Sequence, residues 1–498
     1  METTPTEGPH TSSRPAFRPP RDSKAVAAEA LPEEAEDGVF PLNSGRQRKK
    51  RGLGKMGIIS ALIIGGLLAR AVGGHLLLSL LTTNCRKSLH AAWQQVTPRE
   101  APWEVPTLDQ YERSLPLSLQ LGKQVLAASV QLKEKFVPPV PGQRAEELMK
   151  TLARHLSRGG SENLVGMDVT LSNMQAVGSD ELDRAPHKFT VTKFLGEGGR
   201  SVVVEVKEGD SGKAYAMRLS AFSAAASQPK HVARKLVELM GNVALMQETT
   251  AMLQAAGSTS PSEAGEMRGL AMTSSIATIE GVPSVMQFSS SYLLSEVELM
   301  ERFSGDMLGV FNSINKLPGE SKLYAGKRLL LEVLHLKRAG FSHNDLKLQN
   351  LFVREDGTFF IGDFGAGTLV GQPLDRLTGV TIQYAEKELA VAAEEDTPGD
   401  PRPVADERSD LWSLGLCLYS IFTDGKLPYG LDTTDSPGAT LKELAERKVN
   451  SKTLRRDLMK EGVPLRWQDL IIDLLKVERS ERMDACTLVA NYADIIYL

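Results

Sequence analysis

Residues 343–350 read HNDLKLQN, and residues 361–367 read IGDFGAG. The polar residues of interest in these stretches are Asp345, Lys347, Asn350 and Asp363. Proteins bind Mg²⁺ through oxygen ligands such as carboxylates, and a carboxylate beside a hydroxyl can accept its proton. Phosphoryl transfer needs little more from a protein than such groups held around a triphosphate. The two stretches therefore predict one functional set suited to phosphoryl transfer.

A glycine-rich turn lies upstream, in the stretch LGEGGRSVVVEV at residues 195–206. Its glycines let backbone N–H groups approach a phosphate closely, although many hairpins are also rich in glycine. A dinucleotide-binding fold would need a helix directly after the glycines, whereas RSVVVEV is β-branched and is typical of a strand. We therefore exclude a dinucleotide-binding fold.

The stretch KAYAMRLS at residues 213–220 alternates as a half-buried strand does. One face carries Ala214, Ala216 and Arg218, which leaves room for a flat group beside a cation. Residues 188–220 as a whole predict an antiparallel sheet, and the chain after residue 320 is mainly helical in pattern. The order predicts a two-lobed α+β fold, with a small sheet followed by a larger helical half.

The motifs, in this order, resemble those of the protein kinase superfamily, and the resemblance covers about residues 186–498. It implies a small antiparallel β lobe with one helix, αC, a larger helical lobe, and ATP and Mg²⁺ as ligands. Asp345 would orient the substrate hydroxyl and accept its proton, and Lys347 would neutralise charge on the γ-phosphate. Asn350 and Asp363 would bind Mg²⁺.

The resemblance also implies nucleotide-binding and scaffold residues. Those matched to the nucleotide site are Gly196, Glu197, Gly198, Gly199, Val203, Ala216 and, in the hinge between the lobes, Glu301. Three scaffold positions follow in the larger lobe. Glu388 would pair with Arg482, and Asp410 would lie in the helix that anchors the larger lobe.

Two positions depart from the kinase pattern. Arg218 stands where a lysine is usual, and its planar fork keeps the charge but places it differently. The resemblance makes Glu248 its αC partner, with Glu238 as the competing assignment. Asn344 replaces an arginine that usually contacts a phosphate on the activation loop, which implies that this loop becomes ordered without phosphorylation.

A narrower resemblance is to the rhoptry kinase family of apicomplexan parasites. It rests on the expanded stretch MQETTAMLQAAGSTSPSEA at residues 246–264, the HND variation and the insertion after Glu388. Members of that family are secreted, and some are pseudokinases. Two functions follow: a Ser/Thr protein kinase acting on a protein substrate, weakened by Arg218, or a nucleotide-binding pseudokinase that serves as a scaffold or allosteric partner. A kinase of lipids or small molecules is a third and weaker alternative.

The chain before the kinase-like region divides into three parts. Residues 1–55 are poor in large apolar residues and end in a basic run, so we expect them to be disordered. Residues 56–83 are long and apolar, and three interpretations remain open: a signal peptide or signal-anchor, an amphipathic helix on a membrane, or a buried helix. Met56 is also a candidate start. Residues 84–185 are expected to form a helical linker packed onto the next domain.

The composition narrows the function further. The formal net charge is −4 over 498 residues, which argues against general binding to nucleic acid. The three cysteines include no CxxC pair, and the eight histidines lack metal-ligand spacing, so neither a disulfide framework nor a zinc site is expected. We expect a protein of the secretory pathway, targeted to a rhoptry-like organelle and secreted or membrane-associated.

Overall fold

The computed structural model describes most of the chain from residue 100 onward. The described residues are 100–130, 165–179, 181–198, 201–223, 244–245, 247–288, 291–314, 316–374, 380–394, 402–428 and 451–497. The chain divides into two compact units, and all of these residues belong to the second, Gly74–Leu498. The predicted segments 1–55 and 56–83 lie outside them. No helix among the described residues combines the length and apolar character needed to span a bilayer.

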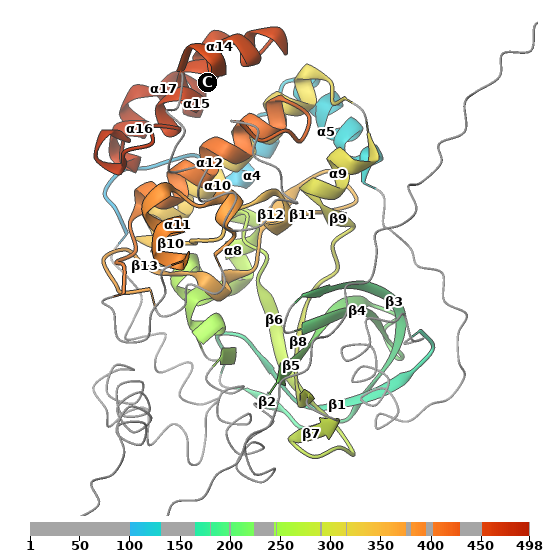
Figure 1. The fold of residues 1–498 in the computed structure, drawn as a ribbon. Helices are drawn as coiled ribbons and strands as arrows, with labels where there is room; N and C mark the ends of the chain where they lie inside the picture. The colour runs from blue at the N-terminus through green and yellow to red at the C-terminus, as the bar shows by residue number, and fades with distance from the viewer. Residues whose placement is uncertain are drawn as a thin grey trace, which may run out of the picture. The chain divides into compact units, whose positions relative to one another are not determined.

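The smaller part of the fold is an antiparallel sheet. Its strands are β1 (Asp168–Ala176), β2 (Leu182–Asp183), β3 (His187–Gly198), β4 (Ser201–Glu208), β5 (Ala214–Ser223), β6 (Thr273–Ile279), β7 (Val285–Phe288) and β8 (Ser291–Glu301). They follow the order β2-β1-β3-β4-β5-β8-β6, with β7 paired to β8. An additional pairing of β1 with β6 closes a ring, whose curvature is visible in Figure 1. The antiparallel sheet expected for residues 188–220 is confirmed.

The interior of the ring is apolar. Val204, Met217 and Leu299 are at most 1% exposed and belong to one core cluster. Because side chains alternate along a strand, Val203, Ala216 and Arg218 lie on the opposite face of the sheet from this core. The alternation expected for KAYAMRLS is therefore confirmed, and the face that carries Arg218 is free to build a site.

The expectation of a helical segment over residues 84–185 is only partly correct. Helices α4 (Leu108–Arg113) and α5 (Leu117–Ser129) lie in it, but Asp168–Ala176 is strand β1. Within β1, Val169 and Leu171 are buried and their neighbours are more exposed, which is the period of a strand. The sheet thus begins before residue 186. Its first strand is stabilised by pairing with β3 and β6, which are distant in sequence.

The larger part is helical. Its helices are α8 (Pro261–Arg268), α9 (Met307–Ser313), α10 (Gly319–Arg338), α11 (Lys387–Glu394), α12 (Glu407–Phe422), α14 (Ser451–Lys460), α15 (Leu465–Leu474), α16 (Ala485–Asn491) and α17 (Ala493–Tyr497). Among the described residues, five short strands lie between these helices: β9 (Gly305–Asp306), β10 (Phe341–Ser342), β11 (Leu351–Val353), β12 (Phe359–Ile361) and β13 (Thr368–Leu369). Helix α10 ends as expected before Gly340, whose φ of +65° favours glycine.

The extension formed by α4 and α5 packs onto α10, as expected. The backbone of α5 lies very close to the start of α10 at Gly122, where an added Cβ would lie 2.6 Å from the carbonyl carbon of Glu320. The hydroxyl of Ser321 donates a 2.8 Å hydrogen bond to the Gly122 carbonyl oxygen. From α4, Glu112 accepts a 2.6 Å bond from Nη1 of the buried Arg328. The extension therefore supplies a counter-charge to the core of the helical lobe.

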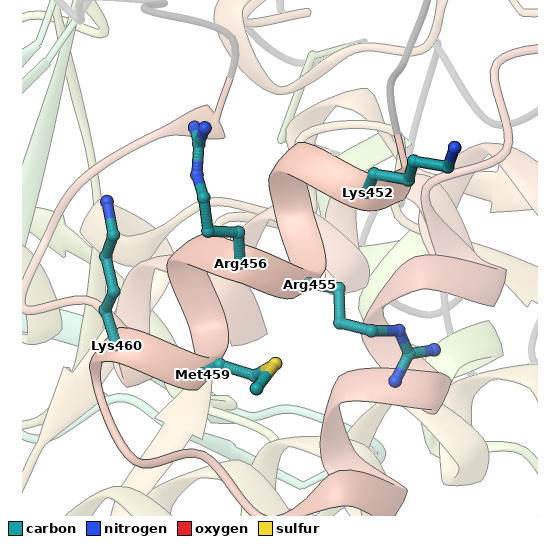
Figure 2. A pocket seen from close by; sticks show the side chains of 5 residues that line it. All are labelled: Lys452, Arg455, Arg456, Met459 and Lys460. Carbon is teal, nitrogen blue, oxygen red and sulfur yellow. The ribbon is translucent and has the colours of Figure 1, made fainter.

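Helix α14 carries a basic surface (Figure 2). A hollow of about 470 Å³ on it is lined by Lys452, Arg455, Arg456, Met459 and Lys460. Arg455 pairs with Asp469 at 2.7 Å, and Asp457 lies 3.3 Å from Arg456. Acidic neighbours therefore offset part of this charge, and the hollow contains none of the residues predicted for the site.

Candidate active site

The stretch HNDLKLQN forms the loop between β10 and β11, and a buried aspartate holds its start. Asp410, on α12, accepts hydrogen bonds from the backbone N–H groups of His343 (2.6 Å) and Asn344 (2.8 Å). It also pairs with the ammonium of Lys337. Burial alone would raise the pKa of Asp410, but Lys337 and the N–H of His343 hold it below its usual value. Asp410, predicted only as part of a helix that anchors the larger lobe, thus also fixes the start of this loop.

Asp345 is held through both of its carboxylate oxygens. The ammonium of Lys347 lies 2.7 Å from Oδ2, and the backbone N–H of Thr381 donates to Oδ1 at 3.0 Å. Lys347 also donates to the hydroxyl of Thr381 at 2.8 Å. Asp345 is only 6% exposed, so its orientation is fixed. Sequence reasoning missed Thr381, which follows Asp345 by 36 residues and carries no motif of its own.

Asn350 is oriented by Asp345 as well. Its amide Nδ2 donates to the backbone carbonyl oxygen of Asp345 at 2.8 Å and to Oδ2 at 3.2 Å. Only the NH₂ group can donate to both acceptors, so the amide oxygen of Asn350 is left for another partner. An amide oxygen is a ligand that Mg²⁺ accepts.

Asp363 follows β12 and lies beside the same loop. The N–H of Gly362 donates to the carbonyl oxygen of Asn350 at 2.9 Å, and Nε2 of His343 donates to the Gly362 carbonyl oxygen at 3.1 Å. Asp363 has a φ of +62°, and it is exposed. The backbone bond between Gly362 and Asn350 ties the two segments together, and the exposed carboxylate of Asp363 and the amide oxygen of Asn350 are ligand types that fit Mg²⁺.

Asn344 links this loop to the segment after Asp363. Its φ is +62°, a backbone region in which asparagine is enriched. The side-chain amide donates to the carbonyl oxygens of Ser342 and Ala366, both at 3.1 Å. The residue that departs from the kinase pattern is thus used inside the fold and joins the two motifs to each other.

Arg218 meets two carboxylates. Its Nη1 donates to Oε1 of Glu248, in the helical residues 247–256, and lies 3.5 Å from Oε1 of Glu298 on β8. Burial alone would lower the pKa of Arg218, but the charges of Glu248, Glu298 and Asp363 raise it. The structure therefore brings Arg218, Glu248 and Asp363 together, whereas Glu238 lies outside the described residues.

Glu298 was not predicted. Its sequence signal is weak, because β8 also carries Glu296 and Glu301, and only alternation along the strand indicates that Glu298 shares a face with Met300. The pairing register then places it opposite Arg218. That register depends on which residues of β5 and β8 face each other, which the sequence of either strand alone does not reveal.

The glycine-rich turn joins β3 to β4. Gly196 pairs with Val203, and Gly198 pairs with Ser201. A Cβ added to Gly196 would meet nothing within 4 Å, so open space adjoins the backbone there. Val203 in turn lies opposite Arg218. Gly199 lies outside the described residues, and Glu197 is described only by its place in the strand.

The assignment of the Glu301 side chain to the nucleotide site needs correction. Glu301 lies opposite Tyr215, on the other face of the sheet from Ala216 and Arg218. Its Oε2 accepts a 2.7 Å hydrogen bond from Nη2 of Arg354. The sequence spacing located the end of β8 but not the direction of the side chain, so only the backbone of Glu301 is placed to serve as a hinge contact.

The pairing of Glu388 with Arg482 is also wrong, because Glu386 takes that place. Glu386 and Arg482 have side chains that are 0% exposed, and they form an ion pair. Arg479 forms a second pair with Glu386, and the hydroxyl of Ser409 donates to it at 2.6 Å. In the stretch YAEKE the two glutamates are two residues apart, and only burial distinguishes them.

The comparisons with known proteins agree with this geometry. Residues 276–492 match the family model described as the protein kinase domain. Testis-specific serine/threonine-protein kinase 5 of Mus musculus is 27% identical over 209 residues, which are 40% of this chain and 49% of that protein. Serine/threonine-protein kinase PknL of Mycobacterium tuberculosis is 28% identical over 157 residues, 32% of each chain. The chain thus spans about half or less of the length of these relatives.

Solved structures with a similar fold include two rhoptry kinases. The ROP18 kinase domain in complex with AMP-PNP and sucrose superposes with a TM-score of 0.50 at 18% identity, over 77% of this chain and 95% of that one. ROP2 from Toxoplasma gondii, described as a virulence factor with a protein-kinase fold and no enzymatic activity, gives a TM-score of 0.51 at 14% identity, over 76% and 96%. The chain has the protein kinase fold. The predicted resemblance to the protein kinase superfamily is confirmed by the family model over residues 276–492, and the likeness to rhoptry kinases is one of fold.

Proposed function

We propose that this protein transfers the γ-phosphoryl group of ATP, with Mg²⁺, to Ser or Thr hydroxyls of protein substrates. The observation that carries this proposal is the fixed carboxylate of Asp345, which is held by Lys347 and Thr381 and accepts a hydrogen bond from the amide of Asn350. Transfer requires a positioned carboxylate, a cation near the moving phosphoryl group and a metal-binding oxygen set. Asp345, Lys347 and Asn350 lie within one network of hydrogen bonds, and Asp363 follows Gly362, whose N–H donates to the carbonyl oxygen of Asn350.

Each residue has a role that its contacts support. Asp345 orients the hydroxyl and accepts its proton while the new O–P bond forms and ADP leaves. Lys347, which is paired with Asp345, would neutralise charge on the γ-phosphate. Asn350 and Asp363 would hold Mg²⁺, which supplies charge neutralisation for the phosphates. Arg218, oriented by Glu248, would contact the phosphates nearer to the adenosine.

A second function, a nucleotide-binding pseudokinase, is favoured by one specific observation. The guanidinium of Arg218 pairs with Glu248 and lies 3.5 Å from Glu298, and it presents a cation of different shape from the ammonium of a lysine. A misplacement of about 1 Å near reacting groups can reduce a rate about 10²-fold. In this alternative the protein binds nucleotide in the same cleft and acts through a protein partner.

The N-terminal part of the chain adds a proposal about location. Residues 56–83 would direct the protein into the secretory pathway or hold it at a membrane, ahead of a kinase domain over about residues 186–498. N-terminal sequencing of the mature protein tests this. A mature chain that begins after residue 83 indicates a cleaved signal, and a chain that retains 56–83 indicates an anchor, a membrane-bound helix or a buried helix, which membrane fractionation then separates.

Transfer of labelled γ-phosphate from ATP to a general Ser/Thr substrate such as casein tests the proposed activity. We expect label in casein with the natural protein and Mg²⁺, and none with Asp345→Asn. The control is Asp210→Asn, which changes an exposed aspartate in the turn after β4 and should keep full activity. Absence of transfer by a natural protein that still binds Mg-ATP would establish the pseudokinase alternative instead.

A further inference from the structure

The guanidinium of Arg218 has a second partner that the kinase resemblance did not assign. Glu298 lies on β8, directly opposite Arg218 in the register of the two strands. Its Oε1 is 3.5 Å from Nη1 of Arg218, and its Oε2 accepts a 3.2 Å hydrogen bond from the hydroxyl of Thr273 on β6. The Glu298 side chain is 6% exposed, so the sheet itself fixes its place.

The carboxylates of Glu248 and Glu298 contact the same nitrogen of the Arg218 guanidinium. Nη1 of Arg218 contacts Glu248 and Glu298, and among the described residues no hydrogen bond is formed by Nη2 or Nε. Because a guanidinium is planar, holding Nη1 at two points fixes the direction in which the other N–H groups point. The ammonium of a lysine has a single nitrogen, so it has no second nitrogen whose direction could be fixed in this way.

The charges around Glu298 come from each element packed against it. Arg218 faces it from β5, Glu248 from the helical residues 247–256, and Asp363 from the loop after β12. Burial first, and then the charge of Glu248, raise the pKa of Glu298 to about 7, while Arg218 opposes them. A buried carboxylate left without a cation is costly, so Glu298 and Arg218 are matched to each other.

We propose that Glu298 is a positioning residue for nucleotide binding: with Glu248 it holds Nη1 of Arg218, so that Nη2 and Nε are directed at the phosphates of ATP. This inference rests on the proposed function, since it assumes that nucleotide binds in this cleft. In this site the Arg218–Glu298 pair replaces the usual lysine. Restoring the lysine alone would then harm the site rather than repair it.

A double-mutant cycle read by Mg-ATP affinity tests the proposal. The proteins are the natural chain, Glu298→Gln, Arg218→Lys and the double variant, with Glu280→Gln as a control at an exposed glutamate after β6. We expect each single variant at positions 298 and 218 to bind Mg-ATP about 10-fold more weakly at pH 8. We expect the double variant to bind more tightly than Arg218→Lys alone, because a lysine no longer faces an unpaired buried carboxylate.

Mg-ATP affinity measured over a pH series distinguishes a positioning role from a purely structural one. As pH falls from 8 to 6, Glu298 takes up a proton, and the advantage of the natural chain over Glu298→Gln should shrink. Protonation of ATP itself is common to both proteins and cancels in the ratio. Unchanged affinity in Glu298→Gln, or single effects that simply add in the double variant, would overturn the positioning role alone. A natural chain that fails to bind Mg-ATP would overturn the proposed function as well.

Discussion

Replacing Glu386 by alanine should destabilise the helical lobe strongly. The change leaves the guanidinium of Arg482, whose side chain is 0% exposed, without its anion. Removing one partner of a buried ion pair costs about 3–5 kcal/mol. Carbonyl oxygens of Arg408 and Lys476 still accept hydrogen bonds from Arg482 at 2.7 and 2.8 Å, so we expect the lower end, about 3 kcal/mol. That loss is a large part of a typical domain stability of about 5–15 kcal/mol.

Urea unfolding at pH 7 measures this effect. Trp412 reports it by fluorescence, because its ring lies 5.0 Å from the guanidinium of Arg482. With a urea dependence near 3 kcal/mol per molar, the midpoint should fall by about 1 M. Burial raises the pKa of Glu386, but Arg479 and Arg482 hold it below its usual value. The stabilisation is therefore present at neutral pH and is lost as pH falls through the pKa of the folded state.

Glu388→Ala is the matched control. Its carboxylate accepts only a 3.4 Å hydrogen bond from the backbone N–H of Arg479, and its Oε2 is buried without a partner among the described residues. We expect a loss of less than about 1 kcal/mol. Equal losses for Glu386→Ala and Glu388→Ala would refute the assignment of the buried pair to Glu386.

Three further predictions concern stability, each measured by urea unfolding. Because the pKa of Glu298 is raised to about 7, stability should fall by up to about 3 kcal/mol as pH rises from 4.5 to 7, and Glu298→Gln should flatten this slope. Asn344→Ala should cost about 2 kcal/mol from its left-handed φ and lost amide bonds, and Asn344→Gly should cost less because glycine tolerates that φ; equal costs would contradict a backbone contribution. Glu112→Ala removes a carboxylate that pairs with the buried Arg328, so it should lower the free energy of unfolding by about 2 kcal/mol. Arg113→Ala, on the exposed side of the same helix, should lower it by less than about 0.5 kcal/mol. Similar losses for the two variants would contradict a structural role for the extension.

Local patterns in the sequence were sufficient for much of the site. Asp345 and Asn350 are five residues apart in one loop, so their relation depends on a short piece of backbone. Arg218 was placed on the correct face of its strand by simple alternation. The glycines themselves located the glycine-rich turn, and helical spacing that ends at Gly340 located the end of α10.

The features that sequence reasoning missed all depend on distant partners. Strand β1 carries polar residues that suit a loop or helix, and it becomes a strand through pairing with β3 and β6. Thr381 reaches Asp345 across 36 residues, and Glu298 meets Arg218 through strand register. Glu386 differs from Glu388 only in what surrounds it after folding. Register and burial are set by tertiary packing, which local pattern does not encode.

Calorimetric titration of the natural protein and of Asp363→Ala with ATP, each with Mg²⁺ and with EDTA, tests the central claim most directly. The claim is that Asp345, Asn350 and Asp363 surround one metal-bound triphosphate, whether or not transfer follows. We predict ATP binding by the natural protein that weakens at least 10-fold in EDTA, and a loss of this metal dependence in Asp363→Ala. Binding of equal strength in all four titrations, or no binding by the natural protein, would contradict it.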